Sequence, residues 1–327
     1  MAEAIGDAGT VIEHRHPAPK APARVVVLGA SGFVGSDLAG HLMHLGIETV
    51  GLSSKDIDLC RPEAVDTLAG IVAPTDPVVI VSAITPDRGR DVSTLMRNLM
   101  MGEHLSRFLV SGSCAHVVYI SSDAVYADGV SPVRESSCRA PASLHGVMHL
   151  AREHMLTHAV RATGLPFLIL RPSLLYGARD THNGYGPNRF VRMARGDRKI
   201  ALFGRGEEKR DHVYIRDLSR LIGLALLHGS VGALNVATGT SRSFLEVAQV
   251  VRGLIGDAVE IEYLPRATPA IHRHFDFSAT LKAFPSFRYT SLEEGLAEVV
   301  RELGTGRDWA TGRSGGGHDV RVREVAG

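Results

Sequence analysis

The segment 25-VVVLGASGFVG-35 indicates how this chain of 327 residues folds. Four apolar residues lead directly into glycines at positions 29, 32 and 35. Glycine is required where a strand turns sharply into a helix and where the backbone approaches a pyrophosphate. The N–H groups that begin the following helix then face the phosphates. Because these glycines follow a strand pattern and precede a helical one, we predict a dinucleotide-binding turn.

Strand and helix patterns alternate from this turn to about residue 170. Short β-branched runs lie at 25–28, 49–52, 78–81, 117–120 and 167–170, and helical patterns at about 34–45, 61–70, 92–110 and 144–162. Further helical patterns lie near 213–228, 243–254 and 291–303. The runs VVVLG and VVIVSA are apolar on both faces, as expected of strands buried beneath two helix layers. We therefore predict an α/β fold with a Rossmann-type, doubly wound parallel sheet.

The composition of the chain changes after residue 171, where Gly, Pro and Asn become frequent. We expect a small C-terminal substrate-binding lobe from residues 173–210 and 241–303. The dinucleotide-binding domain would comprise 23–172, with 211–240 returning to it. The Pro/Ala-rich start and the Gly-rich end can bury little, so 1–22 and 304–327 are expected to be flexible.

Composition excludes several classes of function. The formal net charge is +1 with 44 % hydrophobic residues, which gives no electrostatic reason to bind nucleic acid. No apolar run reaches the roughly 18 residues of a membrane span, and the first residues lack a signal-peptide core. Three widely spaced cysteines suggest reduced thiols, so we expect a cytoplasmic protein without a membrane partner.

The end of the second predicted strand bears on the choice of cofactor. NAD-binding turns usually carry an acidic residue about 20 positions after the glycines, where it holds the ribose 2′-hydroxyl. This chain has Ser53, Ser54 and Lys55 there instead. Hydroxyls and an ammonium suit a 2′-phosphate, which favours NADP over NAD. A solvated turn explains the same residues equally well.

Three further motifs carry a family resemblance. They are 119-YISSDAVYADG-129, 168-LILRPSLLYG-177 and 201-ALFGRGEEKRDHVYIRDLSRLIGLAL-226. With the glycine turn, they make the chain resemble the extended short-chain dehydrogenases/reductases from about residue 24 to 303. The early part is similar to dTDP-4-dehydrorhamnose reductases and the later part to UDP-sugar epimerases. The resemblance implies an NAD(P)-dependent epimerase, dehydratase or reductase of a nucleotide-diphosphate sugar, and a homodimer formed through helices of the Rossmann lobe.

The resemblance also implies roles for individual residues. For the cofactor it implies Gly29, Ser31, Gly32, Phe33, Val34 and Gly35 at the pyrophosphate, Asp58 and Leu59 at the adenine, and Ser82, Ala83, Asn98 and Ser173 along its inner path. For the substrate it implies Arg210 at the diphosphate, with Asn188, Phe203 and Arg266, or Arg273 in place of Arg266. Ser122 falls where the family keeps a catalytic Ser/Thr, and Asp123 falls where dehydratases carry an acid.

The stretch 145-HGVMHLARE-153 departs from the family. It aligns with the motif YG-x-x-K-x-x-x-E, but the tyrosine is replaced by His145 and the lysine by His149. A spacing of four places both rings on one face of a helix. Neutral imidazole accepts a proton near pH 7, so His145 can serve as the acid/base and His149 as a weaker support for the cofactor.

Two other interpretations of His145 and His149 are a metal site and a protein that has lost its catalytic activity. A pair spaced H-x-x-x-H suits zinc, and His154 with His158 repeats the spacing, but no third ligand is evident and we expect no metal. The second is a catalytically degenerate NAD(P)-binding sensor or regulatory subunit. Ser122, Arg210 and the glycine turn all persist, so altered catalysis is favoured over loss of catalysis.

Overall fold

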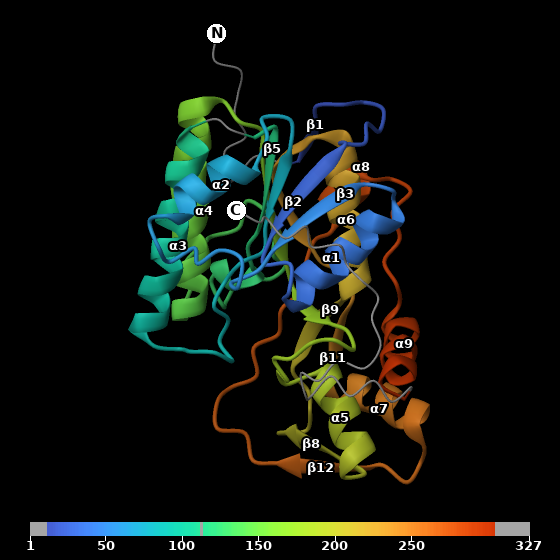
Figure 1. Cartoon of the computed structure of the whole chain (residues 1–327). Coiled ribbons are helices and arrows are strands. Elements are labelled where there is room, and N and C mark those ends of the chain that lie inside the picture. Colours follow the sequence, from blue (N-terminus) through green and yellow to red (C-terminus); the bar gives the residue numbers. More distant parts are fainter. Residues whose placement is uncertain (1–11, 112–113, 305–327) are drawn as a thin grey trace.

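The computed structural model describes residues 12–111 and 114–304, and a seven-stranded sheet forms its centre (Figure 1). In spatial order the strands are β1 (Glu13–His14), β10 (Ser230–Val236), β6 (Phe167–Pro172), β5 (His116–Ile120), β4 (Pro77–Ile80), β2 (Arg24–Leu28) and β3 (Glu48–Leu52). Every pairing is parallel except that of β1 with β10. The Rossmann-type fold predicted from the sequence is confirmed.

Helices cover both faces of this sheet. On one side lie α2 (Ala64–Ile71), α3 (Val92–Val110) and α4 (Leu144–Thr163), and on the other lie α1 (Phe33–His44) and α6 (Ile215–His228) (Figure 1). Along β2, Val25 and Val27 face the α1 and α6 side, and Val26 and Leu28 face the α3 side. Both faces of the strand are therefore buried, which explains its continuous apolar sequence.

A smaller lobe lies below the sheet in Figure 1. It contains a three-stranded sheet of β7 (Leu174–Tyr176), β9 (Lys209–Tyr214) and β11 (Ser241–Ser243), and a parallel pair of β8 (Lys199–Phe203) with β12 (Glu260–Leu264). Its helices are α5 (Pro187–Gly196), α7 (Phe244–Ile255) and α9 (Leu292–Gly304). Helix α8 (Ser278–Ala283) packs near β10. The chain thus enters the small lobe after β6 and returns to the main sheet with β10. After β10 it enters the small lobe a second time.

Part of the segment 1–22, which is expected to be flexible, makes contacts with the main sheet. Strand β1 pairs with the outer edge of β10, and His14 Nδ1 lies 2.8 Å from Ser230 Oγ. The backbone N–H of Lys20 donates to Leu227 O at 2.8 Å. An unpaired edge of β10 would expose its backbone groups, and β1 covers part of that edge. Residues 1–11 lie outside the described residues, and so does the predicted tail at 304–327 apart from Gly304, which ends α9.

Candidate active site

The glycine turn joins β2 to α1, and it leaves no space for a side chain at positions 29 and 35. Gly29 has φ +94°, and a Cβ there would lie 2.9 Å from the backbone nitrogen of Ser82 at the end of β4. A Cβ on Gly35 would lie 2.2 Å from the carbonyl oxygen of Gly29. Glycine is therefore required at both positions, first for the backbone conformation and then for close packing of α1 on the turn.

The N-terminus of α1 fits a phosphate group. Gly32 is the N-cap residue of α1, and no side chain forms a capping hydrogen bond there. The first turn of the helix contains no acidic residue. Its initial N–H groups therefore stay available, at the positive end of the helix dipole. Beside this turn, the hydroxyl oxygen of Ser82 is buried without a hydrogen-bond partner. These features suit the pyrophosphate and inner ribose of a dinucleotide, with Ser31 and Gly32 exposed at the tip.

The turn that follows β3 contains a carboxylate, that of Asp56, for which the sequence predicted no role. Asp56 Oδ2 accepts hydrogen bonds from the backbone N–H of Ser53 at 2.7 Å and from its hydroxyl at 2.6 Å. These two bonds hold the pKa of Asp56 below its usual value. Lys55 is exposed, while Asp58 caps the backbone N–H of Cys60 at 3.0 Å. The turn therefore presents both an ammonium and a carboxylate.

Two of the predicted cofactor residues make structural hydrogen bonds. The amide of Asn98 accepts from the backbone N–H of Ile84 at 2.9 Å and donates to Ile84 O at 3.0 Å. Ser173 Oγ donates to Asp211 O at 3.1 Å. Both side chains are buried, so they hold backbone at the carboxyl ends of β4 and β6.

Ser122 and Asp123 lie at the carboxyl end of β5, where the 3-10 helix η1 (Asp123–Val125) begins. Ser122 Oγ caps η1 by accepting from the N–H of Ala124 at 3.1 Å. The start of α4 is pressed against this turn, since a Cβ on Gly146 would lie 2.1 Å from Ala124 O. The start of α4, which includes His145, therefore packs on η1, the helix that follows Ser122.

The two histidines of α4 contact each other. Their ring centroids lie 4.6 Å apart at an interplanar angle of 87°. His149 is only 5 % exposed, and its Nδ1 lies 2.9 Å from the hydroxyl of Tyr119 on β5. A buried hydroxyl needs an acceptor, so Tyr119 donates to Nδ1, and the ring proton of His149 is then on Nε2.

Both imidazoles are neutral near pH 7. Burial lowers the pKa of His145 below 6.5, and the neighbouring His182 lowers it further. Burial, then His145 and Arg152, lower the pKa of His149 well below 6.5. Desolvation disfavours the charged form, which explains the direction of both shifts. His149 therefore carries no positive charge near pH 7, at the position where the sequence predicts the counterpart of a lysine.

Two adjoining cavities meet at Ser143. The first, of about 300 Å³, is lined by His145, Asn98, Ile84, Thr94 and Leu95 among others. The second, of about 630 Å³, lies between the Rossmann lobe and the small lobe. Its lining includes Asp123, Tyr185, Phe203, Arg210, Arg266 and Arg273.

Each arginine of the larger cavity is paired with a carboxylate. Glu208 accepts from Arg210 at 2.6 Å and from Arg266 at 2.7 Å. Arg273 Nη1 lies 3.4 Å from Asp123 Oδ2. Burial raises the pKa of Asp123, and Arg273 and Arg210 partly oppose that rise. The lining of the cavity therefore combines three arginines with three carboxylates, those of Asp123, Asp128 and Glu208.

Asn188, predicted to contact substrate, lies apart from the lining of this cavity. Its Oδ1 accepts from the N–H of Gly177 at 3.0 Å, and its Nδ2 donates to Asp180 at 2.6 Å. Asp180 also accepts from His182 Nδ1 at 2.8 Å, and His182 Nε2 lies 3.2 Å from Asp87. These contacts join the β4–α3 loop to the segment before α5. No spacing in the sequence indicated them.

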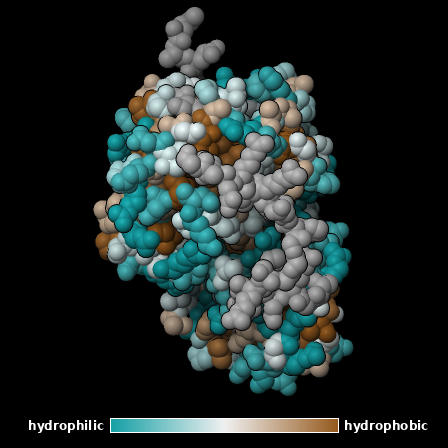
Figure 2. Space-filling model, in the orientation of Figure 1, coloured by the Kyte–Doolittle hydropathy of each residue, from teal (hydrophilic) through white to brown (hydrophobic). Residues whose placement is uncertain are grey.

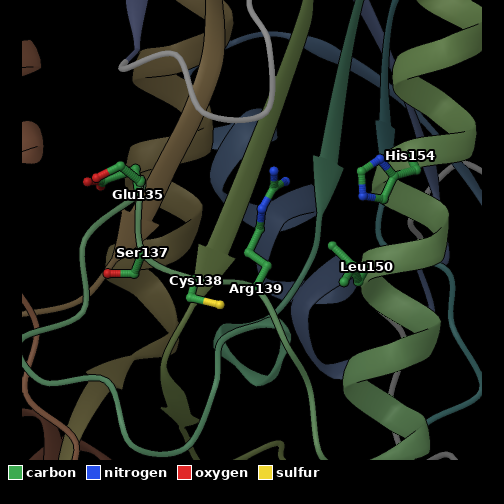
Figure 3. A pocket seen from close by; sticks show the side chains of 7 residues that line it. Glu135, Ser137, Cys138, Arg139, Leu150 and His154 are labelled. Atoms are coloured by element: carbon green, nitrogen blue, oxygen red, sulfur yellow. The ribbon is translucent and has the colours of Figure 1, made fainter.

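A separate cavity of about 400 Å³ lies on another face of α4 (Figure 3). Leu150 and His154 line it from the helix, and Arg139 projects between Glu135 and His154. At 100° per residue, His154 points to the side of α4 opposite His145. This cavity therefore lies apart from the predicted catalytic residues. Within the described part of the chain, no three His, Cys, Asp or Glu side chains form a group that could hold a metal.

Comparison with known proteins decides the family. The profile of the NAD dependent epimerase/dehydratase family matches residues 25–237. The chain belongs to this family. A UDP-glucose 4-epimerase of Halalkalibacterium halodurans is 25 % identical over 280 residues, which cover 74 % of this chain and 83 % of that protein. An ADP-L-glycero-D-manno-heptose-6-epimerase of Alkalilimnicola ehrlichii is 26 % identical with the same coverage.

Solved structures show the same fold. The UDP-glucose 4-epimerase of Thermus thermophilus, in complex with NAD, superposes with a TM-score of 0.76 at 23 % identity. That match covers 86 % of this chain and 99 % of the other. The UDP-glucose 4-epimerase of Thermotoga maritima, with UDP-glucose, gives 0.75 at 22 % identity and the same coverage. Among the described residues, no helix is long and apolar enough to cross a membrane.

Proposed function

We propose that this protein is an NAD(P)-dependent enzyme that epimerises, dehydrates or reduces a nucleotide-diphosphate sugar, with His145 as its acid/base. The observation that carries the proposal is the position of His145. It lines a cavity at the carboxyl ends of the parallel strands, and this cavity adjoins the larger one between the lobes. Ligands of doubly wound sheets bind at that edge. Relatives named as nucleotide-sugar epimerases support the substrate class.

The chain's own residues supply the proton chemistry. The dinucleotide, when bound, accepts or donates the hydride. Neutral His145 takes the proton from a sugar hydroxyl, and Ser122 Oγ donates a hydrogen bond to the reacting oxygen. Asp123, whose pKa is raised by burial, holds a proton more readily than an exposed carboxylate and is the candidate acid of a dehydration.

Arg210 and Arg266 are proposed to bind the diphosphate. A guanidinium matches phosphate oxygens in charge and in hydrogen-bond geometry. Glu208 accepts a hydrogen bond from each of these two arginines. The diphosphate must therefore compete with this carboxylate, or share the two cations with it. The division into a dinucleotide domain and a substrate lobe, as predicted from the sequence, belongs to this proposal.

We propose NAD as the cofactor, in place of the NADP that the sequence favoured. The carboxylate of Asp56 accepts a hydrogen bond from the hydroxyl of Ser53. The sequence had suggested Ser53 as part of a site for the 2′-phosphate. This carboxylate would repel a phosphate and accept from a ribose hydroxyl. Several structural relatives are complexes with NAD, which supports the same choice. Lys55 alone would favour the phosphate.

A sensor or regulatory subunit is the second candidate, and one observation favours it. His149 is neutral and its Nδ1 accepts from Tyr119, so the position of the family's lysine carries no cation. A chain of this kind could keep the dinucleotide as a structural ligand while the chemistry is lost.

Turnover assays separate the two candidates. Parent, His145→Phe and the double variant His145→Tyr, His149→Lys are incubated with UDP-, dTDP- and ADP-sugars and each cofactor. An enzyme shows turnover in the parent that falls about a hundredfold or more in His145→Phe, while calorimetry finds unchanged cofactor affinity. Activity confined to the double variant would identify a sensor. A parent that binds neither dinucleotide would refute both candidates.

We also propose a homodimer formed through α3 and α4. Val92, Met96 and Met100 follow one face of α3 at helical spacing and are 62, 51 and 45 % exposed. Leu144 and Val147 add exposed apolar surface on α4. Brown patches appear on the flank of Figure 2 where Figure 1 places these helices. A second copy would cover this face. A cytoplasmic location accords with the free thiols of Cys60, Cys114 and Cys138.

A further inference from the structure

Arg152 is a fully buried cation that the proposed mechanism does not use. It lies on α4 three residues after His149, and none of its surface is exposed. Its Nη1 donates to the backbone oxygen of Ser82 at 2.8 Å. Its Nε and Nη2 are buried without a hydrogen-bond partner. Polar groups left in this condition are rare in folded proteins and call for an explanation.

No carboxylate of the described residues pairs with this guanidinium. The neighbouring Glu153 accepts from Arg171 at 2.8 Å and from Ser121 at 2.6 Å, and it also pairs with Arg139. Within residues 12–111 and 114–304, no ion pair includes Arg152. Arginine stays protonated in proteins, so the fold encloses an uncompensated positive charge. Burial of such a charge is unfavourable for stability, which argues for a function.

The surroundings of Arg152 place its charge beneath the dinucleotide site. Its Cζ lies 5.2 Å from the ring centroid of Tyr119, whose hydroxyl bonds His149. Ser82, which accepts from Arg152, lies against Gly29 of the glycine turn. Arg152 itself lines neither of the two adjoining cavities. It therefore acts through space, from between the glycine turn and the histidine pair.

We propose that Arg152 is an electrostatic positioning residue whose buried charge favours the reduced, uncharged nicotinamide over the oxidised, cationic one. Arg152 would thus provide the positive charge near the cofactor that the neutral His149 does not provide. The sign follows from Coulomb's law, because a fixed positive charge repels the pyridinium ring of the oxidised cofactor and leaves the neutral dihydropyridine unaffected. This inference rests on the cofactor-binding part of the proposed function.

The test compares affinities for NAD⁺ and NADH and needs no turnover. Dissociation constants are measured by calorimetry for the parent, Arg152→Met and Arg152→Lys. Arg161→Met, on the same helix with an exposed residue, is the matched control. We expect Arg152→Met to lower the preference for NADH over NAD⁺ by about tenfold, with Arg152→Lys and the control close to the parent.

A second variant guards against a folding defect. His149→Lys combined with Arg152→Ala returns the cation to the family's position and should keep the parental preference. The ligand-free Arg152→Met protein should melt no lower than the parent, because it loses an unpaired charge and keeps most of the packing.

The outcomes are distinct. A parental preference in Arg152→Met overturns the inference, whatever its melting temperature, and leaves the proposed function standing. Failure of both Arg152→Met and the double variant to fold assigns Arg152 a structural role and also overturns it. A parent that binds neither NAD⁺ nor NADH refutes the proposed function and the inference together.

Discussion

The sequence predicts that the imidazole of His145 takes the place of the family's phenol, and the surroundings of this imidazole set the pH at which it can accept a proton. Burial and His182 lower the pKa of His145 below 6.5. Only neutral imidazole accepts a proton, so activity is present above this lowered pKa and is lost as the pH falls through it. The acidic limb of kcat/KM should therefore lie below pH 6.5.

This limb is checked by pH–rate profiles of the parent and two variants. In His145→Phe the limb should disappear together with most of the turnover. In His182→Gln the limb should move to higher pH, because His182 lowers the pKa of His145 electrostatically and its removal lets that pKa rise. A limb above 6.5 in the parent, or one that persists in His145→Phe, would assign the titration to another group.

Glu208 is expected to weaken binding of anionic ligands. It is hydrogen-bonded to both Arg210 and Arg266 in the cavity between the lobes. Glu208→Gln keeps the shape and removes the negative charge, so affinity for UDP-glucose should rise about tenfold. Uridine, which lacks the diphosphate, should bind both proteins equally. A lower affinity in Glu208→Gln would show instead that the carboxylate positions the arginines for the ligand.

Individual residues differ in how far the sequence predicts them. The glycine turn and the histidine pair were found because each occupies a short segment with defined spacing. The contact of Tyr119 with His149 was not predicted, since it joins a strand to a helix across 30 residues. The pairing of Glu208 with Arg266 spans 58 residues. Such contacts depend on tertiary packing, which local patterns do not record.

At the scale of elements, the buried strands were the most predictable. The expected ranges 25–28 and 117–120 each differ by one residue from β2 and β5, whose residues are almost all buried. Strands covered on both faces carry an unbroken apolar signal. By contrast, α5 was missed because PNRFVRMARG is short and rich in arginine. Strand β12 was missed because EIEYL is largely exposed and pairs with the distant β8.

The contact between α4 and η1 tests how the catalytic elements are held together. A Cβ on Gly146 would lie 2.1 Å from Ala124 O, a backbone atom that cannot move away freely. Gly146→Ala should therefore lower the free energy of unfolding by about 1–3 kcal/mol and displace the start of α4 from η1. Denaturant unfolding and turnover would both report the change.

Gly70→Ala is the matched control for that substitution. Gly70 lies within α2, where nothing approaches the position of a Cβ. Alanine there should raise the free energy of unfolding by about 0.4–1 kcal/mol, because it reduces the freedom of the unfolded chain. Equal effects of the two substitutions would contradict the proposed close packing of α4 on η1.

At the scale of the whole molecule, the larger cavity depends on the path of the chain. Asp123 follows a strand of the main sheet, whereas Arg210 lies on β9 and Phe203 on β8 of the small lobe. The chain crosses between the lobes after β6, before β10 and after β10. Residues far apart in sequence are thereby gathered around one cavity. Local patterns indicated a second lobe but could not predict which of its side chains meet Asp123.

The exposed apolar face of α3 predicts that the protein associates as a dimer. Met96 and Met100 stand one turn apart on this face, and α4 packs beside it. Two glutamates placed there would bring like charges together in the apolar interface, where they are strongly unfavourable. The double variant Met96→Glu, Met100→Glu should therefore sediment as a monomer at concentrations where the parent is a dimer. Met43→Glu, on the exposed surface of α1, controls for added charge and should sediment as the parent does. A parent that is monomeric at tens of micromolar, or a double variant that remains dimeric, would contradict this interface.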